Sequence, residues 1–212
     1  MASAQRAAGL NELLRSAGLA ALDPPLLDRF EAYLALILRW NDRINLTAIR
    51  DEEGILRRHF VESIFCARAL PVGIRSLLDF GSGAGLPGIP IALCRPEIAV
   101  TLAESSGKKA SFLNEAVRVL GVSSTVYAGR AENLAVTFDC VILRAVDRMK
   151  EATRAGAKRV APGGSLALMT TSGDLERLRE AVGGTFSWIE PSRLPGGEGR
   201  VLALGQRVST QS

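Results

Sequence analysis

Histidine is almost absent from this chain, and cysteine is scarce. There is one histidine, His59, and there are three widely spaced cysteines, Cys66, Cys94 and Cys140. An odd set of cysteines without a Cys-x-x-Cys pair forms no disulfide framework, and a protein-held zinc site needs more nitrogen and sulfur ligands than these. A nucleophilic triad would have to use His59, and no nucleophile turn surrounds it. We therefore expect no metal site and no triad of this kind.

Long apolar runs are missing as well. No uncharged apolar stretch reaches the roughly 18 residues that a transmembrane helix needs, so we expect no membrane span. The first residues lack the apolar core of a signal peptide, and we expect a cytoplasmic protein. The chain has 212 residues, of which 47% are hydrophobic and 23% are charged. These values are typical of one folded domain, or of one domain with a small appendage.

Lysine is rare, and arginine supplies most of the positive charge. The chain has 22 arginines, 4 lysines and a net charge of +4. Residues 144–159 alone contain six basic and two acidic side chains, which equals the whole net excess. Such a segment is either a solvated helix face or a surface that meets a polyanion.

The apolar pattern changes near Pro71-Val72-Gly73. Before this point apolar residues recur at helical spacing, and Asp23 and Asp51 are placed to begin two helices. After it, short apolar runs alternate with helical segments, which predicts a parallel sheet covered by helices, with its ligand at the carboxyl ends of the strands. The expected strands are 76–80, 100–103, 125–128, 140–143 and 165–170, followed by a closing hairpin of 186–189 and 201–204. The expected helices are 88–94, 108–120, 150–160 and 175–182.

A glycine-rich loop follows the first predicted strand. Its alternate glycines, which let the backbone turn and approach a ligand closely, are Gly81, Gly83 and Gly85. The loop fits the dinucleotide pattern G-x-G-x-x-G, with Glu104 placed as a ribose-binding acid. S-adenosylmethionine is the alternative, and Asp79 favours it because a carboxylate suits a cationic ligand and repels a pyrophosphate. A purely structural loop is the third interpretation.

Motifs along most of the chain resemble those of one bacterial family. They are Trp40-Asn41-x-x-x-Asn45-Leu46-Thr47, Arg58-His59-x-x-x-Ser63, Leu78-Asp79-x-Gly81-Ser82-Gly83-x-Gly85-Leu86-Pro87-Gly88-Ile89-Pro90, Arg95-Pro96-Glu97, Lys108-Lys109-x-x-Phe112-Leu113, Arg130-Ala131-Glu132 and Arg144-Ala145. In this order, over roughly residues 10–205, they resemble the small-subunit (16S) ribosomal RNA guanine-N7 methyltransferases, also called the glucose-inhibited division protein B family. The resemblance implies an α/β class I S-adenosylmethionine-dependent methyltransferase fold, which is a Rossmann-like, mostly parallel, seven-stranded sheet with an N-terminal helical extension. We expect the extension at residues 1–72 and the methyltransferase domain at residues 73–212.

The resemblance also implies site residues. The family's contacts to S-adenosylmethionine correspond here to Gly81, Leu86, Ala131, Glu132 and Arg144. Together with the residues singled out around the loop, the expected cofactor-binding set is Asp79, Gly81, Gly83, Gly85, Leu86, Glu104, Ala131, Glu132 and Arg144. The expected RNA-binding set is Arg58, His59, Arg148, Lys150 and Arg154. The family usually has Lys-Gly where this chain has Met169-Thr170, and Asp where it has Glu104.

Arg144 follows an apolar strand, and three contacts would explain it. It can bind the cofactor carboxylate, hold an RNA phosphate or guanine O6, or pair with an acid such as Asp79 or Glu132. The resemblance favours a ligand contact.

The implied reaction fits the scarcity of acid–base residues. Guanine N7 carries a lone pair and no proton, so it attacks the sulfonium methyl group directly and needs no general base. Alignment and exclusion of water are the remaining tasks, and the target base must be unstacked or lie in an open loop. We name no catalytic residue and interpret His59 as structural or RNA-contacting. The expected partner is small-subunit ribosomal RNA or a ribosomal particle, bound by a monomer.

Three other functions stay open from the sequence. A non-catalytic RNA-binding protein would retain the fold without methyl transfer. A small-molecule methyltransferase would not need the basic segment, and an NAD oxidoreductase comes last because neither tyrosine is followed by a lysine four residues later.

Overall fold

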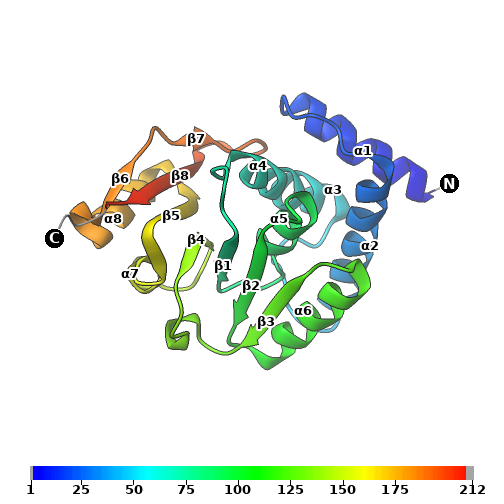
Figure 1. Cartoon of the computed structure of the whole chain (residues 1–212). Helices are drawn as coiled ribbons and strands as arrows, with labels where there is room; N and C mark the ends of the chain where they lie inside the picture. The colour runs from blue at the N-terminus through cyan, green and yellow to red at the C-terminus, as the bar shows by residue number, and fades with distance from the viewer. Residues whose placement is uncertain (1, 209–212) are drawn as a thin grey trace.

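A mostly parallel sheet forms the centre of the molecule (Figure 1). The computed structural model describes residues 2–208, with side chains described from residue 9. The strand order is β3-β2-β1-β4-β5-β8-β6, with the short strand β7 paired to β8. Strands β1 to β5 run parallel, whereas β8 is antiparallel to β5, β6 and β7. The strands are β1 Ser76–Phe80, β2 Ala99–Glu104, β3 Ser124–Ala128, β4 Phe138–Arg144, β5 Val160–Thr171, β6 Phe186–Trp188, β7 Ser192–Arg193 and β8 Arg200–Arg207.

This arrangement confirms the expected fold class and the closing antiparallel hairpin. The seven-strand path matches the expected number, and the two-residue strand β7 is an addition that the sequence did not predict. The helices are α1 Ala2–Ser16, α2 Pro24–Asn41, α3 Glu52–Gly54, the π-helix η1 Ile55–Val61, α4 Glu62–Ala69, α5 Gly88–Cys94, α6 Gly107–Leu120, α7 Met149–Ala157 and α8 Ser172–Val182, with short 3-10 turns η2 Ala131–Asn133 and η3 Gly183–Thr185. Within residues 2–208, no helix combines the length and the apolar character that crossing a membrane requires.

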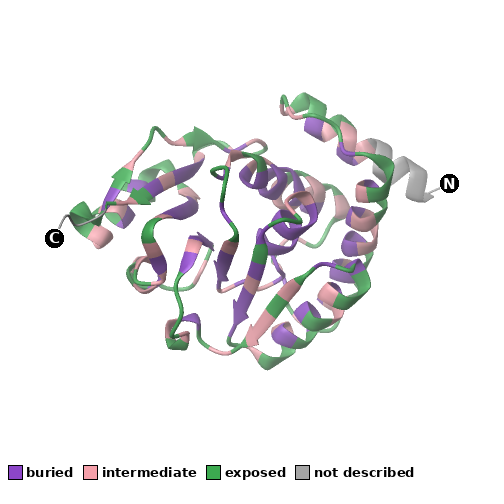
Figure 2. Ribbon diagram, viewed as in Figure 1, coloured by how far each residue is buried: buried purple, intermediate pink, exposed green. Residues whose placement is uncertain are grey.

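Two hydrophobic cores cover the two faces of the sheet. Leu77 of β1 and Ile142 of β4 belong to the core that α1, α2, η1, α4, α5 and α6 share. Their neighbours Leu78 and Val141 belong to the other core, which α7 and α8 cover. Successive side chains of a strand point to opposite faces, so the continuous apolar runs of these strands follow from burial on both sides (Figure 2).

The helix starts at Asp23 and Asp51 follow the sequence signals, whereas several other boundaries differ from the prediction: β5 begins at residue 160 instead of 165, and α8 begins at residue 172 instead of 175. Asp23 accepts a hydrogen bond from the Leu26 N–H, and Asp51 accepts one from the Gly54 N–H, as expected of N-caps. The helix that Asp51 begins changes to π geometry over η1, which an apolar pattern of period 3.6 cannot reveal. Helix α7 ends at Ala157 instead of residue 160, because Val160 already pairs with Phe138 in the sheet.

The N-terminal helices pack directly on the sheet and its helices. Tyr33 of α2 donates a hydrogen bond to the carbonyl of Ala84 in the glycine loop. Arg29 donates to the Leu120 carbonyl at the end of α6, at 2.7 and 3.0 Å. Because one hydrophobic core contains side chains from both sides of residue 72, the extension helps to fix the loop that follows β1.

Candidate functional site

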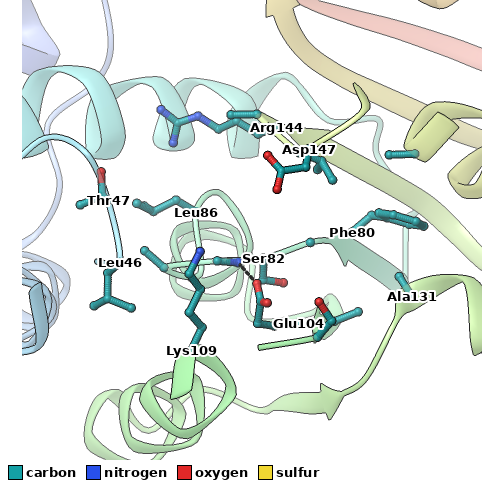
Figure 3. A pocket seen from close by; sticks show the side chains of 18 of the residues that line it. Leu46, Thr47, Phe80, Ser82, Leu86, Glu104, Lys109, Ala131, Arg144 and Asp147 are labelled. Atoms are coloured by element: carbon teal, nitrogen blue, oxygen red, sulfur yellow. Dashed lines mark hydrogen bonds between the residues drawn. The ribbon is translucent and has the colours of Figure 1, made fainter. Parts of the chain in front are cut away.

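A cavity of about 830 Å³ opens at the carboxyl ends of β1, β2 and β4 (Figure 3). This is the edge where the parallel-sheet pattern predicts a ligand. Its walls come from the glycine loop, the ends of these strands, the joint between α2 and α3, and the start of α7. The predicted site residues that line it are Gly81, Gly83, Leu86, Glu104, Ala131, Glu132, Arg144, Arg58, His59 and Arg148.

The glycine loop is held by the neighbouring strand. The N–H groups of Gly81 and Ser82 donate to the Ala103 carbonyl at 3.0 and 2.9 Å. Gly83 has a φ of +57°, and a Cβ added there would meet no atom outside its neighbours nearer than the Gly81 carbonyl oxygen, at 4.0 Å. The backbone at Gly83 therefore borders open space in the cavity wall, and only glycine adopts this conformation without strain.

Glu104 joins the loop to the end of β2. One carboxylate oxygen accepts from the Gly83 N–H at 2.9 Å, and the other accepts from the Ser106 N–H at 2.7 Å. Figure 3 shows this carboxylate at the cavity wall, on the same side as Lys109. The two N–H groups fix its orientation, and each oxygen keeps a further lone pair for a ligand.

Asp79 and Gly85 do not line the cavity, which corrects the expectation that they touch a ligand. Asp79 is only 1% exposed, and its carboxylate accepts from the Gly88 N–H at 3.0 Å. Burial raises the pKa of Asp79 to about 7. Gly85 faces Ile89 and Tyr33, and a Cβ there would lie 2.5 Å from the Ile89 side chain. Both residues therefore shape the loop from behind.

Arg144 lies at the end of β4 in a buried charge cluster with Glu62 of α4. Its Nη2 contacts the Glu62 carboxylate at 3.1 Å and the Arg58 carbonyl at 2.7 Å. Arg200 of β8 contacts the same carboxylate oxygen at 3.0 Å, and Arg58 Nε lies 3.5 Å from the other one. The acids expected for Arg144 were the wrong ones, because Asp79 faces Gly88 and Glu132 pairs with Arg130.

The single histidine is held at both ring nitrogens. Nδ1 of His59 lies 2.9 Å from Arg144 Nη2, and Nε2 lies 2.7 Å from the Thr47 hydroxyl. Since a guanidinium only donates, Nδ1 is the acceptor, and the neutral ring carries its proton on Nε2 and donates to Thr47. Burial and the Arg144 charge lower the pKa of His59 to about 3.

The basic segment after β4 divides into two parts. Arg148 is exposed and lines the cavity, 3.8 Å from Glu151. Lys150 and Arg154 lie outside the cavity lining, and Arg154 donates to the Ala181 carbonyl of α8 at 3.2 Å. Because successive residues of α7 point in different directions, the run of charges in the sequence is not one surface.

Glu62 and Arg200 of the buried charge cluster escaped the sequence reasoning, as did four charged residues of the cavity wall: Lys109, Arg130, Asp147 and Glu151. Glu62 lies four residues after Arg58 on the same helical stretch, which was the available signal. Arg200 follows a glycine-rich turn and carried no signal. Among the described residues, no group of histidine, cysteine and carboxylate side chains could hold a metal ion.

Comparisons with known proteins place the chain among the methyltransferases. A family model described as rRNA small subunit methyltransferase G matches residues 26–187. The chain is 38% identical over 205 residues to the ribosomal RNA small subunit methyltransferase G of Roseiflexus sp. strain RS-1, covering 89% of this chain and 86% of the relative. It is 43% identical over 195 residues to the protein of the same name from Stenotrophomonas maltophilia strain K279a, covering 90% and 89%.

Solved structures agree on the fold at low sequence identity. The mitomycin 7-O-methyltransferase MmcR matches with a TM-score of 0.60 and 14% identity over 70% of this chain and 54% of that one. The P. horikoshii TYW2 structure, in complex with MeSAdo, matches with a TM-score of 0.59 and 16% identity over 71% and 63%. The M. jannaschii TYW2 structure, in complex with AdoMet, matches with a TM-score of 0.56 and 13% identity over 70% and 77%.

Proposed function

The chain belongs to the rRNA small subunit methyltransferase G family, and from this premise we propose that it transfers a methyl group from S-adenosylmethionine to N7 of a guanine in small-subunit rRNA. Methylation of rRNA itself follows from the family. The identity of the cofactor, the guanine atom and the absence of a general base are the proposed parts. The family disfavours the two alternatives of a non-catalytic RNA-binding protein and a small-molecule methyltransferase.

The cavity fits S-adenosylmethionine in its chemistry. Gly81 and Gly83 would admit the methionine part against the backbone, and Leu86 supplies apolar cover. The Glu104 carboxylate, fixed by two N–H groups, would accept hydrogen bonds from the ribose hydroxyls. Ala131 and Glu132 follow β3, where they would border the adenine. When bound, the cofactor supplies a methyl group activated by a sulfonium.

The same loop is poorly suited to a dinucleotide. A pyrophosphate binds to free N–H groups at the N-terminus of the helix after the loop. Here the Gly88 N–H at the start of α5 already donates to the buried Asp79 carboxylate, and an ionised carboxylate there would repel a phosphate. This contact supports the monocationic cofactor over NAD.

The engagement of His59 is the observation that carries the N7 assignment. A methyl acceptor such as an amine or a hydroxyl loses a proton during transfer, and a histidine beside it would be the usual base. Both nitrogens of His59 are bonded to side chains, and its pKa of about 3 makes it a poor proton acceptor at neutral pH. Guanine N7 has no proton to lose, so this chain's residues need only orient the base and exclude water.

The test is to locate the methyl group. Small ribosomal subunits from cells that lack this gene are incubated with the enzyme and S-adenosylmethionine, and the nucleosides are analysed by mass spectrometry. We expect N7-methylguanosine with the wild type and none with Gly83→Val. In a separate binding titration, we expect S-adenosylmethionine to bind and NAD not to bind. Methyl transfer to an amine, a ring N–H or a hydroxyl would refute the proposed acceptor. Comparing naked rRNA, precursor particles and finished subunits in this assay identifies the substrate form.

We also propose that the enzyme acts as a monomer in the cytoplasm, where small-subunit rRNA is available. The exposed large apolar side chains among the described residues are all aliphatic and lie in separate segments: Val72, Val119, Val136, Ile189 and Val208. Light scattering of the purified protein should give a mass close to 22.6 kDa. A stable dimer at micromolar concentration would contradict this.

A further inference from the structure

A second, smaller cavity lies beside the main one and is lined by positive charge. It has a volume of about 350 Å³, between the joint that follows α2 and the N-terminal turn of α6. Its basic side chains are Arg43, Arg50, Lys108 and Lys109, and we call this set the basic groove. Lys109 lines both cavities, so the basic groove continues into the site of methyl transfer.

The four charges of the basic groove have no counter-charge in an ion pair among the described residues. Arginines elsewhere on the surface, by contrast, pair with Glu53, Glu97, Glu115 and Glu132. One acid, Asp42, lines the groove, which leaves three positive charges in excess. A concave surface with unpaired charge of one sign attracts a polyanion.

The basic groove is preformed. Asn41 at the end of α2 accepts hydrogen bonds from the N–H groups of Leu46 and Thr47 at 2.9 and 3.1 Å, which fixes the joint. Arg50 donates to the Asn45 side chain at 2.9 Å and is held on the same wall. The opposite wall begins at Ser106, whose N–H donates to Glu104 at 2.7 Å. Figure 3 shows Lys109 facing Leu46 and Thr47 across the cavity.

We propose that the basic groove binds the sugar–phosphate backbone of rRNA next to the target nucleotide and guides it into the main cavity. The proposal rests on the rRNA methyltransferase activity and adds a docking surface on the side of the cavity opposite α7. Arginine and lysine contacts to phosphates position a nucleic acid without reading its sequence. The lining contains no aromatic side chain on which a base could stack, so the backbone is the part of the RNA that fits.

A charge-matched pair of variants tests the proposal. The groove variant carries R43Q, R50Q and K108Q, and leaves Lys109 intact because it also lines the main cavity. The control variant carries R118Q, R177Q and R193Q, which removes three exposed charges that lie outside both cavities and enter no ion pair among the described residues. Binding of each protein to a small-subunit rRNA fragment is measured at several salt concentrations, together with calorimetric titration of S-adenosylmethionine.

We expect the groove variant to lose about 2–3 units of the slope of log K against log salt concentration, since each released phosphate contact contributes about 0.7–0.9. The control variant should lose less than about one unit, and cofactor affinity should stay within twofold for both. An unchanged slope in the groove variant, or an equal loss in the control, would overturn the proposal. Failure of the proposed function shows on a different readout, because methylation at another atom would leave this difference in RNA binding unchanged.

Discussion

Glu62 is the residue whose replacement tests the buried charge cluster most directly. Its side chain is 0% exposed, and its carboxylate faces Arg144, Arg200 and Arg58. In E62Q the side chain keeps its shape and an acceptor oxygen but loses its charge. Burial raises the pKa of Glu62, and the charges of the three arginines oppose that rise. The variant leaves the arginines without a counter-charge.

The loss of stability in E62Q depends on how well each guanidinium can be hydrated once the counter-charge is gone. Arg58 and Arg200 have side chains that are 40% and 20% exposed and can recover hydration, whereas Arg144 is 7% exposed and cannot. Removing one partner of a buried ion pair costs about 3–5 kcal/mol. With one trapped arginine and a retained acceptor, we expect about 3 kcal/mol. For a chain of this length that lowers the melting temperature by about 6–12 °C.

Urea unfolding and calorimetry measure this loss, and E53Q is the control. Glu53 pairs with Arg57 on the surface at 3.2 Å, and its replacement should change stability by less than about 0.5 kcal/mol. The double variant E62L with R144M replaces the buried pair by apolar groups, which often restores stability. We expect it to recover most of the lost stability, whereas methylation should be lost because Arg144 lines the main cavity. A change below about 1 kcal/mol in E62Q, equal to that of the control, would refute the idea that Glu62 holds Arg144 in place.

Three further variants or titrations test the loop and the histidine. Gly83→Val should keep the fold and abolish binding of S-adenosylmethionine, measured by calorimetry. Gly88→Ala should instead reduce the stability of the fold, because its Cβ would lie 2.5 Å from the Asp79 carboxylate. A Gly83→Val protein that binds the cofactor normally would contradict the site. Because the pKa of Asp79 is raised to about 7, its stabilising contribution is complete below about pH 4 and is lost as the pH rises to 7, so the wild type should lose more stability between pH 5 and pH 8 than Asp79→Asn in parallel urea titrations. The pKa of His59 is lowered to about 3, so this group makes stability fall as the pH drops from about 6.5 towards 3, and NMR of the only histidine should still show a neutral ring at pH 5. A ring that titrates near pH 6.5 would remove the argument against a histidine base.

The sheet could be predicted because its strands are buried on both faces. The run Cys140 to Leu143 is uninterrupted and apolar, and Ser76–Phe80 is apolar apart from Ser76 and Asp79; their neighbours in the sheet follow from the alternation with helices. The helix starts at Asp23 and Asp51 were predictable because a cap is a local hydrogen bond, with donor and acceptor within three residues. Local rules therefore predicted β1 to β4 and these two helix starts closely, whereas β5 and α8 begin five and three residues before the predicted positions.

The buried charge cluster around Glu62 could not be predicted, because its contacts join residues that are far apart in the sequence. Glu62 and Arg144 are 82 positions apart, and Arg200 is 138 positions from Glu62. Their contact exists only because α4 packs beside the ends of β4 and β8. Asp79 stands two residues before the glycine loop in every interpretation, yet the sequence cannot show whether its side chain faces the ligand or the Gly88 N–H beneath the loop. The direction of this side chain depends on which face of the sheet position 79 of β1 points to.

Positive and negative charges lie on different sides of the main cavity, and this arrangement bears on how a ligand would lie in it. On the side of β4 and the N-terminal helices, three arginines surround one carboxylate and a neutral histidine, which leaves two positive charges in excess. On the side of β2, the Glu104 carboxylate stands at the wall. If S-adenosylmethionine binds as proposed, its carboxylate would face the arginines and its ribose hydroxyls would face Glu104, because this orientation pairs donors with acceptors at both ends. Under the proposed function, the cluster around Glu62 would therefore orient the cofactor, because the buried carboxylate holds the three arginines in place.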